Sequence, residues 1–174
     1  MARRKLTARV TYLEMRAPPS HRVPAPMGPR LALMRADAMP LHFYRYLYEQ
    51  VGKAHHWLLR RKLSDAALSE AIHGPDTQIE VFYVDGCPAG FFELDLARLP
   101  GEVEIRYFGL VPDFQGRGLS KFFLSSAVFA AWDHDPHKVV IHTNTLDSPR
   151  ALILYQKLGF EPVAWSEEKV EAWS

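Results

Sequence analysis

Residues 115–120 read Gln-Gly-Arg-Gly-Leu-Ser and lie between a strand-like run and an apolar, helix-like run. Glycine at such a junction costs conformational entropy, so it indicates either a turn that other residues cannot make or a ligand that comes close to the backbone. The free N–H groups at the start of a helix attract anions, and Arg117 can add a charge-assisted contact. The segment therefore predicts a site for a phosphate-bearing ligand, with turn geometry as the alternative.

Two familiar phosphate-binding patterns do not fit this stretch. The Gly-Lys-Ser/Thr ending of a P-loop is missing. The glycine spacing also differs from the dinucleotide-binding fingerprint, and the strands before it are expected to form hairpins rather than a strand–helix–strand unit. The sequence thus excludes both of these nucleotide-binding classes.

Four carboxylates on two neighbouring expected strands are candidates for proton transfer. Glu102 and Glu104 share one face of the strand 102–110, and Glu93 and Asp95 form a second acidic pair on the strand before it. The other face of the strand 102–110 carries Val103, Ile105 and Tyr107. Neighbouring carboxylates favour one another's protonation, which suits a base working near neutral pH, whereas the alternative is a solvated polar face. We predict Glu104 as the base, with Glu93 as the second candidate.

The elements that must position these residues alternate between strands and helices. Two β-rich runs around Asp85-Gly86 predict a hairpin, and Pro100-Gly101 leads into a third strand. Strands are expected at 7–16, 30–36, 79–84, 89–96, 102–110, 137–144 and 161–165, with 169–173 as a further candidate. Helices are expected at 41–52, 64–73, 118–132 and 148–158. This order predicts an α/β (α+β) fold with helices packed on a mixed sheet.

The domain organisation follows from the position of the prolines. Residues 1–29 comprise a strand and a Pro-rich arm, because 17–29 contains five prolines. The remaining residues, 30–174, are expected to form one domain, which has enough residues for a hydrophobic core.

Composition excludes several functional classes. The net charge of +1 does not support a nucleic-acid-binding surface, and no run is long and apolar enough to predict a membrane span or a secretion signal. Cys87 is the single cysteine, which fits a reducing compartment, and the eight histidines lack a metal-ligand spacing. We therefore expect a cytoplasmic protein without a metal and without nucleic-acid or membrane partners.

Two motifs together carry a resemblance to a known family. Gln115 to Ser120 resembles the acetyl-CoA-binding motif Gln/Arg-x-x-Gly-x-Gly/Ala of the GCN5-related N-acetyltransferases (GNAT), with serine in the last small position. Ala151 to Phe160 resembles the later family pattern Ala-x-x-Leu-Tyr-x-x-x-Gly-Phe. Both motifs occur in the family order, with a helix and a strand between them. The resemblance covers about 30–166 and is close from about 79 onward.

The resemblance implies a mostly antiparallel sheet that splays between the strands 102–110 and 137–144. In this family the pantetheine arm of CoA pairs with the freed backbone, and the pyrophosphate lies on the amides of the glycine turn. A backbone amide nearby could hold the thioester carbonyl as it becomes an oxyanion. Gly109 fits this picture, because glycine inside a strand marks a bulge or a close approach. The implied cofactor-binding residues are Phe108, Gly109, Leu110, Gln115, Gly116, Arg117, Gly118, Leu119, Ser120 and Lys121.

The implied activity is transfer of an acetyl group from acetyl-CoA to a primary amine, by direct attack in a ternary complex. Tyr155 matches the family's usual proton donor, although a tyrosine on an amphipathic helix can simply reach water. Glu104 lies eleven residues before Gln115, which is the position of the catalytic glutamate in the histone acetyltransferase branch. Ser148 replaces an asparagine that contacts the cofactor in many members, and we do not transfer that role to Asn144.

Other hypotheses stay open. His55, His56 and Trp57 fall where the family's substrate loops lie, with a partly buried aromatic cluster as the alternative. The acceptor is a small-molecule or peptide amine. A non-catalytic CoA-binding regulatory module would share the fold, and an interaction protein would use the Pro-rich arm and the aromatic helix 41–50. A homodimer that completes the sheet edge is a further hypothesis.

Overall fold

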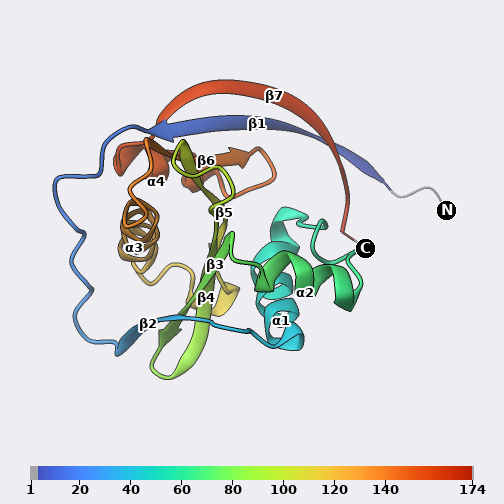
Figure 1. The fold of residues 1–174 in the computed structure, drawn as a ribbon, viewed down its shortest axis with the longest axis horizontal. Coiled ribbons are helices and arrows are strands. Elements are labelled where there is room, and N and C mark those ends of the chain that lie inside the picture. The colour runs from blue at the N-terminus through green and yellow to red at the C-terminus, as the bar shows by residue number, and fades with distance from the viewer. Residues whose placement is uncertain (1–3, 174) are drawn as a thin grey trace.

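A seven-stranded sheet forms the centre of the computed structural model, which describes residues 4–173 (Figure 1). Its strand order is β2-β3-β4-β5-β6-β1-β7, and all neighbours are antiparallel except the parallel pair β5 and β6. The strands are β1 (Lys5–Met15), β2 (Leu31–Arg35), β3 (Thr77–Val84), β4 (Cys87–Asp95), β5 (Glu102–Leu110), β6 (Lys138–Asn144) and β7 (Glu161–Glu171). The helices are α1 (Leu41–Gly52), α2 (Asp65–His73), α3 (Ser120–Trp132) and α4 (Pro149–Lys157), with short 3₁₀ turns η1 (Lys53–His55) and η2 (Pro112–Phe114). The predicted mixed, mostly antiparallel sheet with flanking helices is confirmed.

Local sequence signals account for the element boundaries in the middle of the chain. Asp85 and Gly86 both adopt positive φ, +50° and +85°, as a two-residue hairpin turn requires. Ser64 caps α2 by accepting a hydrogen bond from the Ala67 N–H at 3.2 Å. Pro149 occupies the first turn of α4, where its missing N–H costs nothing. This turn and these two helix starts determine where β3, β4, α2 and α4 begin or end.

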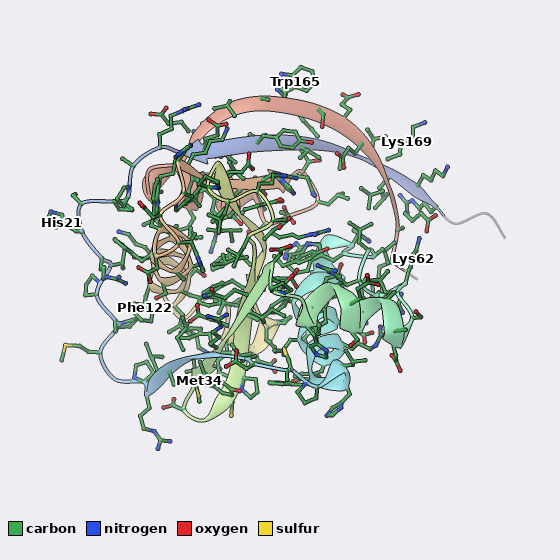
Figure 2. The ribbon with its side chains drawn as sticks, in the orientation of Figure 1. His21, Met34, Lys62, Phe122, Trp165 and Lys169 are labelled. Carbon is green, nitrogen blue, oxygen red and sulfur yellow. The ribbon has the colours of Figure 1, made fainter. Side chains whose placement is uncertain are left out.

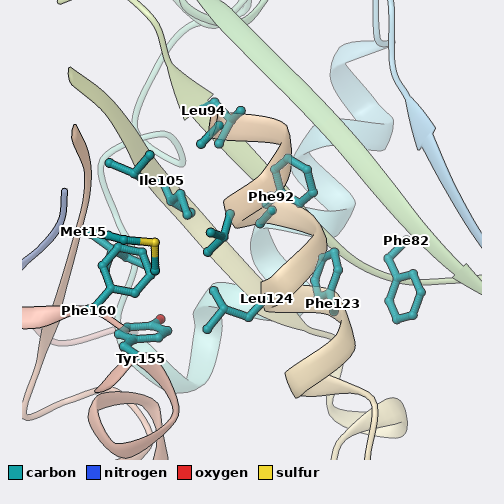
Figure 3. Close-up of a cluster of buried hydrophobic side chains, with 14 of the residues drawn as sticks. Met15, Phe82, Phe92, Leu94, Ile105, Phe123, Leu124, Tyr155 and Phe160 are labelled. Carbon is teal, nitrogen blue, oxygen red and sulfur yellow. The ribbon is translucent and has the colours of Figure 1, made fainter. Parts of the chain in front are cut away.

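Two pairs of helices cover the two faces of the sheet (Figure 1). On one face, α3 places Phe123 against Phe82, with ring centroids 4.7 Å apart, and Figure 3 shows Tyr155 and Phe160 completing this cluster. On the other face, α1 lies against β4 and β5, and α2 lies against β3. Burying one large apolar side chain contributes about 1.5–3 kcal/mol, so both layers stabilise the sheet.

The central strand β5 and its neighbour β6 pair over only part of their length. The parallel ladder between β5 and β6 runs from the pair Glu102 and Lys138 to the pair Ile105 and Ile141. Both strands continue beyond that point, to Leu110 and Asn144. The described chain thus contains the expected splay between 102–110 and 137–144.

A β-bulge changes which face of β5 a residue occupies. Glu93 pairs with Tyr107 and Leu94 pairs with Ile105, so Arg106 is an extra residue in the ladder. Ile105 therefore belongs to the cluster under α3, whereas Tyr107 packs under α1. The prediction that Tyr107 shares a face with Val103 and Ile105 was wrong, because strict alternation ends at the bulge.

The N-terminal strand lies inside the sheet. β1 pairs with β6 on one side and with β7 on the other, and the ribbon β1–β7 arches over the molecule in Figure 1. β7 is one continuous strand, so the expectation of separate strands at 161–165 and 169–173 was wrong. The side chains of β7 are mostly exposed and do not alternate with buried ones, and Trp165 points outward from the top of the arch (Figure 2). The pairing with β1, rather than a buried face, determines its length.

The Pro-rich arm follows the surface of α3. The Val23 N–H donates to Ser125 Oγ at 3.1 Å, and the Arg22 guanidinium lies 4.1 Å from the centre of the Phe129 ring. The boundary proposed at residue 29 stays a prediction, and residues 1–3 and 174 of the two proposed ranges lie outside the described residues. Within the described chain, no helix is long and apolar enough to cross a bilayer.

Candidate functional site

The opening between β5 and β6 exposes backbone groups of β5. The Val111 N–H donates to the Ala89 carbonyl at 2.7 Å and so points toward β4, whereas the Leu110 carbonyl accepts from Gln115 Nε2 at 3.2 Å on the other side. Backbone groups alternate along a strand, so those of Phe108 point the same way as those of Leu110. An extended ligand in the opening would find strand-like hydrogen-bond partners there.

The glycine turn stands at the end of this opening. Gly116 and Gly118 adopt φ of +72° and +74°, and a Cβ atom added at either would meet no atom within 4 Å. Conformation rather than crowding therefore requires glycine, and the space beside the backbone stays accessible. The first hydrogen bond of α3 runs from the Phe123 N–H to the Leu119 carbonyl at 3.0 Å, so the amides of 120–122 precede the helical ladder.

These amides and one guanidinium fit the pyrophosphate of CoA chemically. Arg117 lies over the Phe114 ring, 4.9 Å from its centre, within the same turn. Free N–H groups at a helix start and a nearby positive charge are the donors that phosphates bind. The structure thus brings together the predicted residues Gly116 to Lys121, while Gln115 holds the turn against Leu110.

Gly109 has a different reason to be glycine than the one expected. A Cβ atom at this position would lie 2.5 Å from Val51 Cγ1 on α1. Gly90 on β4 shows similar crowding, since a Cβ there would meet the Gly109 carbonyl oxygen and the Leu110 backbone. The close approach that Gly109 permits is therefore that of α1 to the sheet. A role for its backbone in cofactor binding stays a prediction.

Tyr155 reaches the sheet from α4. Its ring is buried, meets Phe160 edge-on with centroids 6.2 Å apart, and lies beside Leu124 in Figure 3. Burial raises the pKa of the Tyr155 hydroxyl well above its usual range, and the negative charge of Asp147 adds to this shift. The hydroxyl therefore keeps its proton at neutral pH, as a proton donor must.

The turn between β6 and α4 is held by its own polar side chains. Asp147 Oδ2 accepts hydrogen bonds from Thr143 Oγ1 at 2.7 Å and from the Asn144 N–H at 3.0 Å. Asn144 Oδ1 accepts from the Leu146 N–H at 2.8 Å, and Ser148 Oγ caps α4 by accepting from the Arg150 N–H at 3.3 Å. Asn144 and Ser148, the two positions considered for the family's cofactor-contacting asparagine, thus both stabilise this turn.

Glu104 lies where β5 and β6 begin to part. Its side chain is 12 % exposed, and Oε1 is 3.6 Å from His142 Nδ1 on β6. Its other oxygen, Oε2, is 4.0 Å from Arg98, which binds Glu102 more closely at 3.1 Å. His142 was not among the predicted site residues, because a histidine inside a strand carries no local signal of its cross-strand neighbours.

Glu93 occupies a closed environment instead. Its carboxylate accepts from the Tyr44 hydroxyl and from Arg60 Nη2, both at 2.7 Å, and only 1 % of the residue is exposed. Burial and the Glu93 charge raise the pKa of Tyr44 above its usual range, so Tyr44 stays a donor. The structure thus places the second predicted base in a buried network, and the alternative of a solvated Glu93 was wrong.

The segment between α1 and α2 closes one side of the opening. Trp57 packs against Tyr48 and Tyr107, with ring centroids 5.6 and 5.0 Å away. His55 Nδ1 lies 3.3 Å from the Leu146 carbonyl oxygen and 3.8 Å from Asp147 Oδ1, so this segment reaches the β6–α4 turn. The predicted aromatic cluster is therefore present, and it borders the opening.

The C-terminal end of β7 meets the same segment. His56 Nδ1 accepts from the Trp173 N–H at 2.8 Å, and Lys62 pairs with Glu171 at 2.6 Å near the end of β7 (Figure 2). Trp173 and Glu171 were not among the predicted site residues, because contacts between segments far apart in sequence leave no local pattern. The α1–α2 segment and the end of β7 are thus joined by side-chain contacts. Among the described residues, no group of three or more His, Cys, Asp or Glu side chains could hold a metal ion.

Comparison with known proteins agrees with this geometry. The model of the acetyltransferase (GNAT) domain family matches residues 46–174. No curated protein sequence matches this chain significantly. A protein from Novosphingobium aromaticivorans assigned to the GNAT family shares 16 % identity over 97 % of this chain, at a TM-score of 0.65. A GCN5-related N-acetyltransferase from Kribbella flavida shares 16 % identity over 98 % of this chain, at a TM-score of 0.62.

A third similar structure carries the ligand that the motif suggests. It is a GNAT family acetyltransferase from Elizabethkingia anophelis with acetyl-CoA bound, 18 % identical over 77 % of this chain and 78 % of its own, at a TM-score of 0.58. The other two are longer proteins, of which this chain covers 66 % and 61 %. At these identities the structural similarity establishes the fold, and the family model establishes the family.

Proposed function

This chain belongs to the acetyltransferase (GNAT) family, and from that premise we propose that it transfers the acetyl group of acetyl-CoA to a primary amine. One juxtaposition carries the proposal: the opening between β5 and β6 leads directly to the turn of Gly116 and Gly118. The free backbone groups of β5 could pair with an extended arm of the ligand. The amides of the glycine turn, which follows β5, could then bind its pyrophosphate.

Acetyl-CoA would supply the activated acetyl thioester. The amides from Gly116 to Lys121 and the Arg117 guanidinium would bind its pyrophosphate. The backbone of Phe108 and Leu110 would pair with its extended arm, which would hold the thioester between the two strands.

Transfer needs three further contributions from the protein. A base must remove a proton from the amine, a backbone donor must stabilise the oxyanion, and an acid must protonate the leaving thiolate. Glu104 is the carboxylate at the opening, and Tyr155 is the buried hydroxyl that keeps its proton. The amine would attack the thioester carbon directly while both substrates are bound.

The test combines binding with turnover. Isothermal titration should show that acetyl-CoA binds, and thiol release over a panel of small and peptide amines should rise with at least one of them. Binding without turnover on any amine would favour a CoA-binding module, and absence of binding would overturn the proposal.

A matched pair of glycine variants localises the site. Gly116→Val should weaken acetyl-CoA binding about tenfold or more, which corresponds to ~1.4 kcal/mol, because a branched side chain strains a positive φ and covers the amides. Gly28→Val is the control, since Gly28 also has positive φ and open space but lies in the Pro-rich arm. Equal binding by both variants would place the ligand elsewhere.

A further inference from the structure

Glu104 and His142 contact each other where β5 and β6 part. We infer that His142 is the general base that takes the proton from the acceptor amine, and that Glu104 positions it. The inference rests on the proposed function. It differs from the sequence prediction in that the imidazole of His142, rather than the carboxylate of Glu104, accepts the proton.

Strand register places His142 at the point where the opening begins. Ile141 forms the last pair with β5, so His142 is the next residue along β6. Val139 and Ile141 are buried under α3, and side chains alternate along a strand, so His142 faces the other side of the sheet. Glu104 lies on that same side, between the buried residues Val103 and Ile105. Both side chains thus lie on the face of the sheet that α1 covers.

The geometry of the pair favours the tautomer that a base requires. Glu104 Oε1 lies 3.6 Å from Nδ1, so the carboxylate favours a proton on that nitrogen. Nε2, on the far side of the ring, then keeps its lone pair. His142 is 44 % exposed at its side chain, against 12 % for Glu104, so the imidazole is the more accessible of the two groups. An incoming ammonium group meets the imidazole more readily than the carboxylate.

Tyr12 and Glu104 approach the imidazole from the two neighbouring strands. Tyr12 of β1 contacts the ring edge-on, with centroids 5.5 Å apart, and its hydroxyl lies 3.2 Å from Ser166 Oγ and 3.4 Å from Glu168 Oε1 on β7. On β5, Glu104 faces Nδ1 directly, and Arg98 approaches that carboxylate at 4.0 Å. Glu104 is therefore a charged group within ion-pair distance of the imidazole.

The proposed base and acid stand on opposite sides of the sheet. His142 faces the α1 side, whereas Tyr155 belongs to the cluster under α3. A thioester held between β5 and β6 would expose its carbonyl carbon to an amine from one side and its sulfur to the Tyr155 hydroxyl from the other.

Protons and electrons balance in this arrangement. The ammonium form of the acceptor gives one proton to His142 Nε2, and its freed lone pair forms the C–N bond. The C–S bond breaks, the thiolate takes the Tyr155 proton, and the attached nitrogen loses its second proton. One proton replaces that of Tyr155 and one reaches solvent, so the products are the amide, CoA thiol and one proton.

Histidine variants test the inference with the amine that wild type uses best. His142→Gln should reduce turnover at pH 7 by about 10²-fold and leave acetyl-CoA binding unchanged. The loss should shrink as pH rises, because solvent then deprotonates the amine. Added imidazole should partly restore turnover of His142→Ala, which a merely structural role would not produce. His21→Gln, in the Pro-rich arm, is the matched control and should behave like wild type.

A glutamate variant separates positioning from direct catalysis. Glu104→Gln should lower turnover about tenfold and leave the acid limb of the pH–rate profile in place, because the imidazole keeps its accepting nitrogen but loses the carboxylate that orients its ring. Glu70→Gln on exposed α2 is its control. If Glu104→Gln removes the acid limb while His142→Gln keeps the wild-type profile, Glu104 is the base and the inference is wrong. If wild type acetylates no amine, the proposed function fails as well.

Discussion

Glu93 and Glu104 lie on neighbouring strands and on the same face of the sheet, but their surroundings are opposite. Glu93 accepts hydrogen bonds from Tyr44 and Arg60 and is closed to solvent. Glu104 has a longer contact with His142 at the edge of an opening. A carboxylate bound on both oxygens stabilises the fold, whereas a loosely paired one can still take part in proton transfer. Partners and solvent access therefore distinguish the two glutamates, since their residue type and sheet face are the same.

The largest expected effect concerns the stability role of Glu93. Glu93→Gln should lower the free energy of unfolding by about 3 kcal/mol, because it leaves the buried Arg60 charge without its counterion. Glu104→Gln should change it by less than about 1 kcal/mol. Urea denaturation of both variants measures the difference. Equal stability of Glu93→Gln and wild type would show that the closed network does not support the fold.

The next effect concerns the proposed acid, Tyr155, on the other face of the sheet. Tyr155→Phe should lower turnover by about 10²-fold, or ~2.7 kcal/mol, with little change in acetyl-CoA affinity, because it removes only the hydroxyl. Tyr46→Phe on the exposed face of α1 is the control. Steady-state thiol release measures turnover, and isothermal titration measures acetyl-CoA affinity. Full turnover by Tyr155→Phe would remove it as the acid.

A smaller effect on stability should distinguish Gly109, which is crowded by Val51, from Gly118, which has a positive φ. Gly109→Ala should cost about 1–3 kcal/mol of stability, because the new methyl group meets Val51. Shortening the opposing side chain in the double variant with Val51→Ala should recover part of that loss. Gly118→Ala should instead cost about 1 kcal/mol through its positive φ, with no recovery from Val51→Ala. Identical behaviour of both glycines in this cycle would contradict the distinction.

The smallest effect comes from an ion pair on the same face as the two carboxylates. Glu14 accepts from Lys138 at 2.6 Å, and this hydrogen bond lowers the Glu14 pKa below 4.5 despite partial desolvation. The stabilisation is therefore present above about pH 4.5 and disappears as pH falls through the lowered pKa. Glu14→Gln should cost less than about 1 kcal/mol at pH 7 and nothing at low pH. A constant difference across pH would assign the effect to packing.

Local signals made much of this architecture predictable. Asp85-Gly86 fixed a hairpin through positive φ, and Gly116 with Gly118 marked the turn before α3. Features that depend on contacts between distant parts of the chain could not be predicted from the sequence. The bulge at Arg106 turned Tyr107 to the other face, and the burial of Glu93 depended on Tyr44 and Arg60, which lie 49 and 33 residues away in sequence.

The position of β1 shows the same limit. Its alternating residues predicted a strand, but nothing in residues 7–16 specified that it would lie between β6 and β7. His142 became a candidate only after strand register placed it beside Glu104. Cross-strand contacts of this kind depend on sheet order, which a single sequence does not encode locally.

Nuclear magnetic resonance of backbone amides during titration with acetyl-CoA tests the central claim most directly, because it compares the two regions in one experiment. The amides of Phe108, Leu110 and residues 116–122 should shift in a saturable way, whereas those of Tyr44, Glu93 and Arg60 should move little. Shifts confined to the buried network, or absent along β5 and the glycine turn, would contradict the account.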